Sequence, residues 1–433
     1  MTGERRERLL LWLLACLQFT HILDFMMISP LSPQFMRLWG ISAQEFGYLV
    51  SVYAIAAAVA GLAAAFVIDR FERRSALLAM YAGFVVATLA CALAPGYWSF
   101  FTARALAGVF GGVIGSIVLA IIGDLIPAER RGRAMGVVMS AFPVVSVIGV
   151  PAGLYIATHL GWHAPFFALA ALSAALWFVL PLLVPRVDAH LRLVAPAATD
   201  AQGVPGKAGA PGVAPPPRNL LHNFLQLFTV PNHRRALASV FVFTLSGFMV
   251  FPFLSAYQVK NVGITEAELV YVFLFSGLAT LFTSRLIGWC ADRYGKRRVF
   301  FLLALASTVP LVLATHLPRA SLAVLIAVTV PFMVLMSGRF IPLMALITTC
   351  VHAPVRGAFM SLSSSVQNLG AGVASLFAGA VIGHSTDGAL TRFDLVGIGA
   401  VFLTFACMLL VRGLRPVPEP ASLTMAVAAG APR

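Results

Sequence analysis

The sequence predicts an all-α integral membrane protein with twelve transmembrane helices in two pseudo-symmetric six-helix bundles. Three observations predict this class. Of the 433 residues, 60% are hydrophobic and 11% are charged, whereas soluble domains have about half and about a quarter. Apolar runs of roughly 20 residues, the length of a membrane-crossing helix, recur along the whole chain. The two halves of the chain also resemble each other, which indicates a duplication.

The predicted spans fall into two groups of six. They cover residues 9–30, 46–68, 75–94, 97–122, 134–157, 163–185, 236–256, 269–291, 299–317, 320–350, 357–382 and 393–413. Between the sixth and the seventh span, the stretch "APAATDAQGVPGKAGAPGVAPPP" is rich in Pro, Gly and Ala and predicts a flexible linker. We therefore divide the chain into a first bundle at 1–185, a linker at 186–233, and a second bundle with a short tail at 234–433.

The basic residues lie mainly on one side of the predicted membrane. Most of the 30 Lys and Arg residues fall in the termini, the linker and the loops on their side. The loops on the other side hold only Arg37, Lys260, Arg319 and Arg392. Because cytoplasmic loops carry the excess of Lys and Arg, both termini are predicted to be cytoplasmic. The net charge of +14 then requires no nucleic-acid partner.

The halves align at an offset of 223 residues, and the matches fall at corresponding helix ends. Gly40, Glu45, Asp69 and Arg70 match Gly263, Glu268, Asp292 and Arg293. Two parallel six-helix repeats joined by a linker place a substrate site at the midplane, between halves that rock against each other. The duplication therefore favours a transporter.

Two basic loops carry matching charge clusters. The loop "GWCADRYGKRRV" contains Gly288, Asp292, Arg293, Gly295, Lys296 and Arg297, and its first-half copy "AFVIDRFERR" contains Asp69, Arg70, Arg73 and Arg74. A Gly one turn before the Asp lets two helices approach closely. Charge contacts that form in one conformation and break in the other would act as a conformational latch. Such clusters also determine topology, so both roles stay open.

These loops resemble the G-x-x-x-D-R-x-G-R-R/K motif that the major facilitator superfamily carries in both halves. The first copy departs from it, with Ala65 and Glu72 where the motif has Gly. The stretch "FFTARALAGVFGG" resembles the fourth-helix motif R-x-x-x-G of that family, at Arg104 and Gly108. The resemblance implies a multi-pass carrier of the bacterial inner or plasma membrane that works as a monomer and is not an enzyme.

Two further stretches narrow the resemblance. "SVIGVPAG" resembles the fifth-helix Gly-Pro motif of antiporters, through Gly149, Pro151 and Gly153, although Gly and Pro there could equally serve packing alone. "SGRFIPLMALITTCVHAPVRGAFMS" resembles bacterial efflux permeases of the drug:proton antiporter group, also labelled arabinose-efflux-like. The resemblance implies export of a small molecule, with a proton as coupling ion and with no cofactor or metal.

An aspartate lies inside the first predicted span, in the stretch "FTHILDFMMISP". A charge at the centre of a bilayer costs about 2.5–3.5 kcal/mol, so such residues are usually functional. At 1.5 Å per residue, Asp24 lies ~22 Å from the inner membrane edge, and Arg104 in the fourth span lies ~10 Å below the outer edge. The two charges share a depth and are predicted to form an ion pair.

The predicted pair suggests a proton-coupling site at Asp24, His21 and Arg104. Desolvation favours a neutral aspartic acid and a nearby arginine favours the carboxylate, so alternation between the two environments would move a proton. His21 lies one turn away on the same face, beside Thr20, and could relay that proton. A permanent ion pair and a hydrogen-bonded packing histidine remain the alternatives.

The substrate cavity is expected between the halves. The serines and the asparagine of the eleventh span share one helix face, where they would line the cavity or join helices. Met and Phe beside them would form an adaptable apolar wall. Arg339 would pair with a carboxylate, with carbonyls near Pro342 or with an anionic substrate. The predicted lining residues are Thr20, Met27, Phe248, Phe251, Met336, Arg339, Ser361, Ser364, Ser365 and Asn368.

Motif searches exclude several energy sources. Ala208, Asn261 and Arg297 follow the three lysines, so the chain has no Walker loop for ATP. It also has no H-E-x-x-H or G-x-S-x-G hydrolase motif. The predicted function is therefore proton-coupled efflux of small organic compounds or drugs by alternating access. A sugar or metabolite exporter and a non-transporting membrane sensor on the same scaffold are the alternatives.

Overall fold

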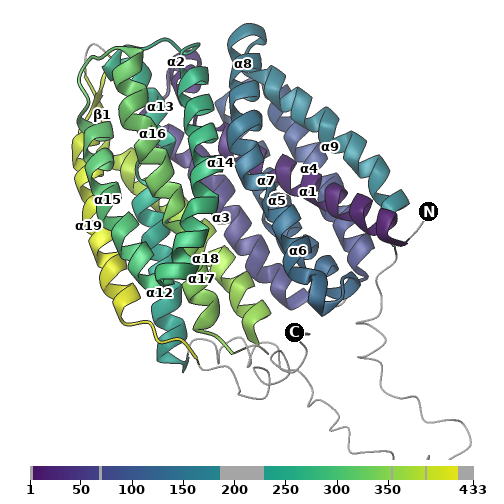
Figure 1. Ribbon diagram of the computed structural model, residues 1–433. Helices are drawn as coiled ribbons and strands as arrows, with labels where there is room; N and C mark the ends of the chain where they lie inside the picture. The colour runs from purple at the N-terminus through teal and green to yellow at the C-terminus, as the bar shows by residue number, and fades with distance from the viewer. Residues whose placement is uncertain (1–2, 68–70, 186–228, 353–354, 386–387, 418–433) are drawn as a thin grey trace, which may run out of the picture.

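The computed structural model describes residues 3–67, 71–185, 229–352, 355–385 and 388–417. These residues form two adjoining groups of helices, which are coloured purple to blue and teal to yellow in Figure 1. The only strands among the described residues are two short ones that form a hairpin near one end of the second group. The predicted all-helical class is confirmed.

The first group contains the elements from α1 to α9. They are α1 (Gly3–Met27), α2 (Ser32–Leu38), α3 (Ala43–Val67), α4 (Arg73–Leu93), α5 (Tyr97–Leu125), α6 (Ala128–Met139), α7 (Ala141–Val144), the π-helical turn η2 (Val145–Gly149), α8 (Val150–Leu160) and α9 (His163–Leu183).

The second group follows after residues 186–228. It contains α12 (Pro231–Phe248), α13 (Phe251–Tyr257), the π-helical turn η3 (Gln258–Val262), α14 (Leu269–Tyr294), α15 (Lys296–His316), α16 (Leu322–Gly338), α17 (Phe340–Thr349), α18 (Arg356–Val381), β1 (Gly383–His384), β2 (Leu390–Thr391) and α19 (Phe393–Arg412). The strands β1 and β2 are antiparallel.

Eleven helical segments of the described residues are long and apolar enough to cross a membrane. The helix α18 is not one of them, because Arg356, Gln367, Asn368 and several serines lower its apolarity. It has 26 residues and packs along α3 of the first group. The predicted number of twelve spans is thus confirmed for eleven, and the span at 357–382 stays a prediction.

Three spans are interrupted near their middle, each time close to a proline. The helix α13 starts just before Pro252, α17 starts two residues before Pro342, and η2 ends two residues before Pro151. Proline has no N–H to donate and its ring clashes with the preceding turn, so it loosens the helix at these positions. The interrupted turns carry residues that line the central cavity described below.

The groups contact each other through α3 with α18, and through α14 with α7, η2 and α8. Glycines permit the first contact. A Cβ on Gly47 would lie 2.6 Å from the backbone O of Ser375, and a Cβ on Gly379 would lie 2.9 Å from the backbone O of Ala43. We call the end of the molecule with α2 and β1–β2 the hairpin end. The linker end is where α9 ends and α12 begins (Figure 1).

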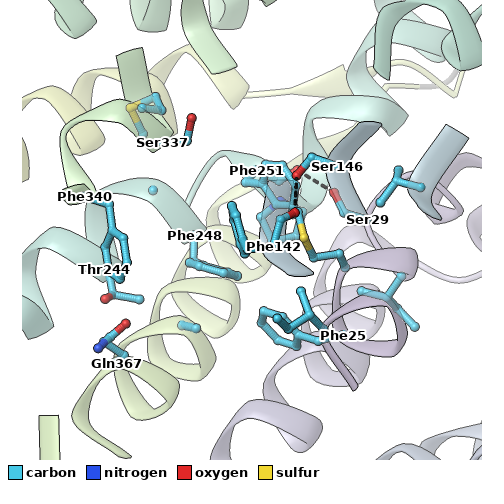
Figure 2. Close-up of a pocket in the computed structure, with 18 of the residues that line it drawn as sticks. Phe25, Ser29, Phe142, Ser146, Thr244, Phe248, Phe251, Ser337, Phe340 and Gln367 are labelled. Carbon is cyan, nitrogen blue, oxygen red and sulfur yellow. Dashed lines mark hydrogen bonds between the residues drawn. The ribbon is translucent and has the colours of Figure 1, made fainter. Parts of the chain in front are cut away.

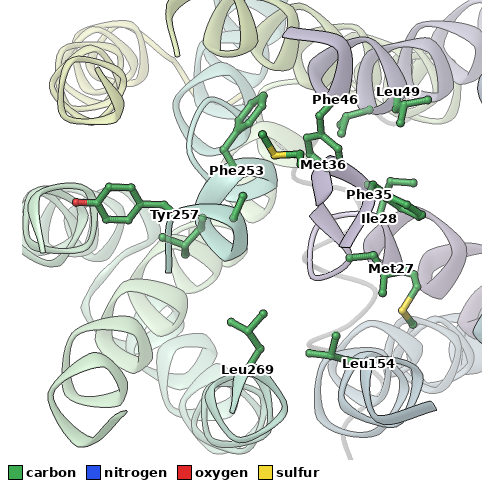
Figure 3. Packing of buried hydrophobic residues seen from close by; sticks show 14 of the residues in the cluster. Met27, Ile28, Phe35, Met36, Phe46, Leu49, Leu154, Phe253, Tyr257 and Leu269 are labelled. Carbon is green, nitrogen blue, oxygen red and sulfur yellow. The ribbon is translucent and has the colours of Figure 1, made fainter. Parts of the chain in front are cut away.

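The hairpin end is closed by contacts between the two groups. Arg37 forms an ion pair with Glu266, and Ser29 Oγ donates to the backbone O of Phe251 at 2.7 Å. The rings of Phe46 and Phe253 pack with centroids 5.7 Å apart, within an apolar cluster that spans both groups (Figure 3). The central cavity is therefore sealed off on this side.

His384 adds a further contact at the hairpin end. The backbone N–H of Ala43 donates to His384 Nε2 at 2.9 Å, so this nitrogen is unprotonated. Desolvation and the positive charge of Lys260 lower the pKa of His384. The closed end therefore favours the neutral ring.

We expect this closure to weaken in acid. A histidine with a lowered pKa stabilises the closed end fully above its ordinary pKa of about 6.5, and the contribution is lost as the pH falls through the lowered value. Spin labels at the exposed Leu38 and Arg319, on different groups, should therefore report longer distances at pH 5 than at pH 7.5. The variant His384→Gln, which keeps an acceptor but does not titrate, should flatten this response. If the distances in His384→Gln lengthened at pH 5 as much as they do in the wild type, the expectation would be wrong.

At the linker end, Leu62 of α3 packs against an apolar cluster of the second group, but no hydrogen bond or ion pair joins the described residues of the two groups there. The polar contacts found there join elements of one group: Arg73 with Asp124 at 3.3 Å, Arg130 with Glu7 at 3.0 Å, and Arg297 with the backbone O of Leu414. Among the described residues, no atom of another segment lies within 4 Å of a Cβ built on Gly288. The close approach predicted at Gly288 is therefore not made in this conformation.

The predicted latch residues lie at this end. Asp69 and Arg70 fall outside the described residues. Asp292 and Arg293 are exposed, and the guanidinium of Arg293 lies 5.4 Å from the centre of the Trp289 ring. Gly295 joins α14 to α15 with a φ of +94°, a left-handed conformation that favours glycine, and Lys296 begins α15. Arg74 lies in the first turn of α4, where its backbone N–H bonds Glu72.

Candidate functional site

A central cavity of about 360 Å³ lies between the two groups. It is lined from α1, α3, α5 and η2 on one side and from α12, α13, α14, α16 and α18 on the other. Both halves of the duplication therefore build the same site, at the depth where the interrupted spans bend.

The walls of this cavity are mainly apolar (Figure 2). Aromatic rings and methionines dominate, among them Phe25, Met26, Tyr53, Phe142, Phe248, Phe251, Phe332, Met333, Met336 and Phe340. Polar groups are few, and they include His21, Ser29, Ser146, Thr244, Gln367 and Asn368. Among the described residues, no Asp or Glu lines the cavity, and Arg339 is the one Lys or Arg that does.

The predicted ion pair of the first group is formed. Arg104 Nη1 donates to Asp24 Oδ2 at 2.7 Å and approaches the backbone O of the same residue at 3.3 Å. Both side chains have no exposed surface. Neither one lines the cavity, although Tyr53 does, and the Arg104 guanidinium lies 4.2 Å from the centre of the Tyr53 ring. Tyr53 therefore stands between the pair and the cavity.

The neighbours of Asp24 on α1 point in different directions. Thr20 Oγ1 lies 2.8 Å from Tyr81 Oη on α4, whereas His21 lines the cavity. The sequence interpretation placed Thr20, His21 and Asp24 on one face, which is too coarse. At about 100° per residue, His21 is turned roughly 60° from Asp24 and roughly 100° from Thr20. That turn separates a cavity residue from two residues packed against neighbouring helices.

The cavity contains half of the predicted lining residues. Phe248, Phe251, Met336, Arg339 and Asn368 line it, while Thr20, Met27, Ser361, Ser364 and Ser365 lie elsewhere. Ser365 faces α3, because its Oγ would be 2.9 Å from a Cβ on Gly61. Ser361 bonds its own helix at the backbone O of Gly357, and Ser364 is exposed. Because α18 crosses α3, only Asn368, the last residue of this polar stripe, reaches the cavity.

The fifth-span motif packs against α1. A Cβ on Gly153 would lie 2.0 Å from Met27 Cε, which explains why Met27 is not in the cavity, and a Cβ on Gly149 would lie 3.0 Å from Leu23 Cδ1. Pro151 is buried at the start of α8. In this conformation the motif holds the span against the helix that carries Asp24.

Comparison with known proteins decides the family. A sequence model described as Major Facilitator Superfamily matches residues 14–232 and 236–429. The chain belongs to the major facilitator superfamily. It is therefore a multi-pass membrane transporter and not an enzyme.

The individual relatives have low sequence identity with this chain. The uncharacterized MFS-type transporter YceJ of Bacillus subtilis (strain 168) is 24% identical over 390 residues, which cover 89% of this chain and 93% of that protein. Multidrug resistance protein 2 of the same organism is 31% identical over 155 residues, 36% of this chain and 38% of the relative. The crystal structure of a D-xylose-proton symporter superposes with a TM-score of 0.72 at 17% identity, covering 96% and 99% of the two chains, and so shares the fold.

Sequence reasoning missed several cavity residues of this major facilitator protein. Tyr53, Ser29, Ser146, Thr244 and Gln367 line the cavity but were not predicted to do so. The sequence contains an indication for Gln367, since this polar residue directly precedes Asn368, which was predicted to line the cavity. Tyr53 had none, because a tyrosine in an apolar span is also common in helix packing.

The Asp24–Arg104 pair makes a prediction for stability that depends on which partner is removed. Asp24→Asn leaves a guanidinium that cannot lose its charge. Removing one partner of a buried ion pair lowers stability by about 3–5 kcal/mol. Arg104→Met leaves an aspartate that can take up a proton, so we expect a loss of about 1–3 kcal/mol. Unfolding of both variants in the same detergent should show the larger loss for Asp24→Asn. The opposite order would mean that Asp24 is charged without Arg104.

Proposed function

We propose that this protein is a proton-coupled antiporter that exports small amphipathic organic compounds by alternating access. The linker end faces the cytoplasm in this proposal, because it carries most of the Lys and Arg residues of the chain. The twelfth span is α18, and the protein acts as a monomer in the inner membrane without a cofactor. The conformation of this structure, closed at the hairpin end, then presents the cavity toward the cytoplasm.

One observation carries the proposal: an apolar cavity, with no carboxylate among its described lining residues, lies beside a fully buried acid–base pair. Asp24 pairs with Arg104, and the Arg104 guanidinium lies on the ring of Tyr53, which lines the cavity. A proton on Asp24 releases Arg104 from its carboxylate partner, and Arg104 is stacked on a wall of the cavity. The titration of Asp24 therefore alters the cavity wall, which couples proton binding to substrate binding.

The cavity also supports the substrate class. Phe and Met side chains form adaptable surfaces for varied apolar bodies, whereas a sugar requires many hydrogen-bonding groups that the walls offer only sparsely. The similarity of part of the chain to a multidrug resistance protein also supports an amphipathic substrate. His21, which lines the cavity beside the pair, is the candidate proton relay.

Proton movement in reconstituted vesicles tests this function. Purified protein in proteoliposomes with an internal pH dye should show substrate-induced proton flux, in a screen of drugs, sugars and organic anions. The expected result is flux with amphipathic compounds and none with sugars. Flux with sugars alone would favour the metabolite exporter, and substrate accumulation without any proton flux would contradict antiport.

The linker-end loops supply a further prediction within this function. Asp292 is exposed, and no described segment lies within 4 Å of a Cβ on Gly288 in this conformation. The latch that they would form therefore belongs to the conformation that is closed at the linker end. Asp292→Asn should slow turnover several-fold and leave the equilibrium binding of substrate unchanged, and Asp292→Glu should restore part of the rate. If turnover is unchanged in Asp292→Asn, the loop is not a latch and serves only to determine topology.

A further inference from the structure

We infer that Arg339 makes the central cavity selective for substrates that carry one negative charge, such as a carboxylate, on an apolar or aromatic body. The inference deepens the proposed function, and it rests on that function only in taking the cavity as the substrate site. The observation that supports this inference is the charge balance of the site.

Arg339 is a buried cation without an acidic partner in the described part of the chain. Its side chain is 1% exposed. Nη2 donates to Ser246 Oγ at 2.8 Å, and Nη1 donates to Thr404 Oγ1 at 2.9 Å and approaches Ser307 Oγ at 3.3 Å. These acceptors are neutral hydroxyls, and Nε has no hydrogen-bond partner among the described residues. Hydroxyl groups satisfy hydrogen bonds but do not neutralise a guanidinium, which is costly to bury as an unpaired charge.

The first half of the molecule shows the contrast. There Arg104 is matched by Asp24, so the two charges cancel beside the cavity. On the second-half side no Asp or Glu of the described residues lines the cavity, and Arg339 does line it. With the pair in its ionised form, the site therefore has one uncompensated positive charge in a low-dielectric setting, where charge interactions are strong. An anion in the cavity would supply the missing charge, and a cation would be repelled.

Other lining residues of the second group indicate the rest of such a ligand. Thr244 and Gln367 lie together with Phe340 on this side of the cavity (Figure 2), and Asn368 follows on α18. Their hydroxyl and amide groups offer donors to a carboxylate. The Phe243 ring lies 5.1 Å from the guanidinium and also lines the cavity. Together with Phe248 and Met336, it provides the surface for a ring or a short alkyl body.

A purely structural role would produce the same hydrogen bonds. Arg339 connects α12, α15 and α19 through Ser246, Ser307 and Thr404, and such a junction could exist to hold the helices together. This role would not distinguish a charged ligand from a neutral ligand of the same shape. The distinguishing measurement is therefore the preference for charge, not the effect of a variant on folding.

The test compares 3-phenylpropionate, which is ionised at neutral pH, with 3-phenylpropionamide, its neutral near-isostere. Binding of each to the purified protein in detergent is measured by isothermal titration calorimetry at low ionic strength. We expect the carboxylate to bind roughly tenfold more tightly, the usual order for a charge-assisted hydrogen bond. Equal affinities, or no saturable binding of either compound, would overturn the inference.

Variants locate the preference on Arg339. Arg339→Met should bring the two affinities within about twofold, and Arg339→Lys should keep part of the preference for the acid. The matched control is Arg285→Met, which removes an exposed positive charge on α14 of the same half and should retain the full preference. If Arg339→Met does not fold, the comparison of the two ligands on the wild-type protein still decides. A preference that survives in a folded Arg339→Met protein would overturn the assignment.

The binding test separates this inference from the proposed function, because it uses no membrane and no proton gradient. Preference for the acid without substrate-induced proton flux in vesicles would leave Arg339 as an anion site and reject antiport. Proton flux with neutral or cationic drugs, together with equal binding of the acid and the amide, would support antiport and reject the anion site.

Discussion

Replacing Asp24 with asparagine should abolish transport that is driven by a pH gradient, while exchange of labelled for unlabelled substrate continues. Asparagine has the size of aspartate and can still accept a hydrogen bond from Arg104, but it does not bind and release a proton. The side chain is fully buried against Arg104 Nη1, so no other group takes over its position. The measurement is gradient-driven accumulation against counterflow in the same proteoliposomes.

The control for this variant is Asp394→Asn, which makes the same chemical change in the first turn of α19. It should leave both activities unchanged. Because Asp24→Asn is also expected to lower stability, retained counterflow is needed to show that the variant is folded. Gradient-driven accumulation at the wild-type level in Asp24→Asn would show that the Asp24–Arg104 pair is a static junction between α1 and α5.

Replacing Gly47 with leucine should prevent closure of the hairpin end. A Cβ at this position would lie 2.6 Å from the backbone O of Ser375 and 3.4 Å from Gly379 Cα, and backbone atoms cannot move aside as a flexible side chain can. Overpacking of this kind costs about 1–3 kcal/mol, which corresponds to a roughly 5- to 150-fold loss of the closed population. Distances between spin labels at Leu38 and Arg319 should lengthen, and turnover should fall with them.

Two other glycines serve as controls for this variant. Gly96 also lies at the hairpin end, but no other segment comes within 4 Å of its Cβ position, so Gly96→Leu should leave the distances unchanged. Gly288→Leu at the linker end should act in the opposite direction, because it obstructs the approach that is absent from this conformation. Unchanged distances in Gly47→Leu would mean that α3 and α18 separate here at little cost.

The pairing of Asp24 with Arg104 was predictable from the sequence because depth in a membrane is nearly one-dimensional. The helical rise and the thickness of the hydrocarbon core determine how deep each residue lies. Two opposite charges at the same depth in a bundle have few other partners and a strong reason to meet. The structure places them in contact at 2.7 Å.

The lining of the cavity was less predictable because it depends on the rotation and crossing of each helix. Ser361, Ser364, Ser365 and Asn368 share a stripe in the sequence, yet α18 crosses α3 and turns only Asn368 of these four into the cavity. Met27 directly follows Met26, which lines the cavity, but its side chain packs toward α8 in the space that the missing side chain of Gly153 leaves. Such outcomes follow from neighbouring helices and not from the residue itself.

The class of protein, the duplicated halves and the depth of the buried charges can be read from the order of residues, because hydrophobicity, repetition and helical rise act along one chain. Three features depend on the packing of distant helices: which end of the molecule is closed, the place of Tyr53 between the Asp24–Arg104 pair and the cavity, and the contacts of Arg339 with hydroxyls but with no described carboxylate. These features arise where side chains from distant helices meet. Close packing determines which side chains come into contact, and a local sequence pattern does not predict these contacts.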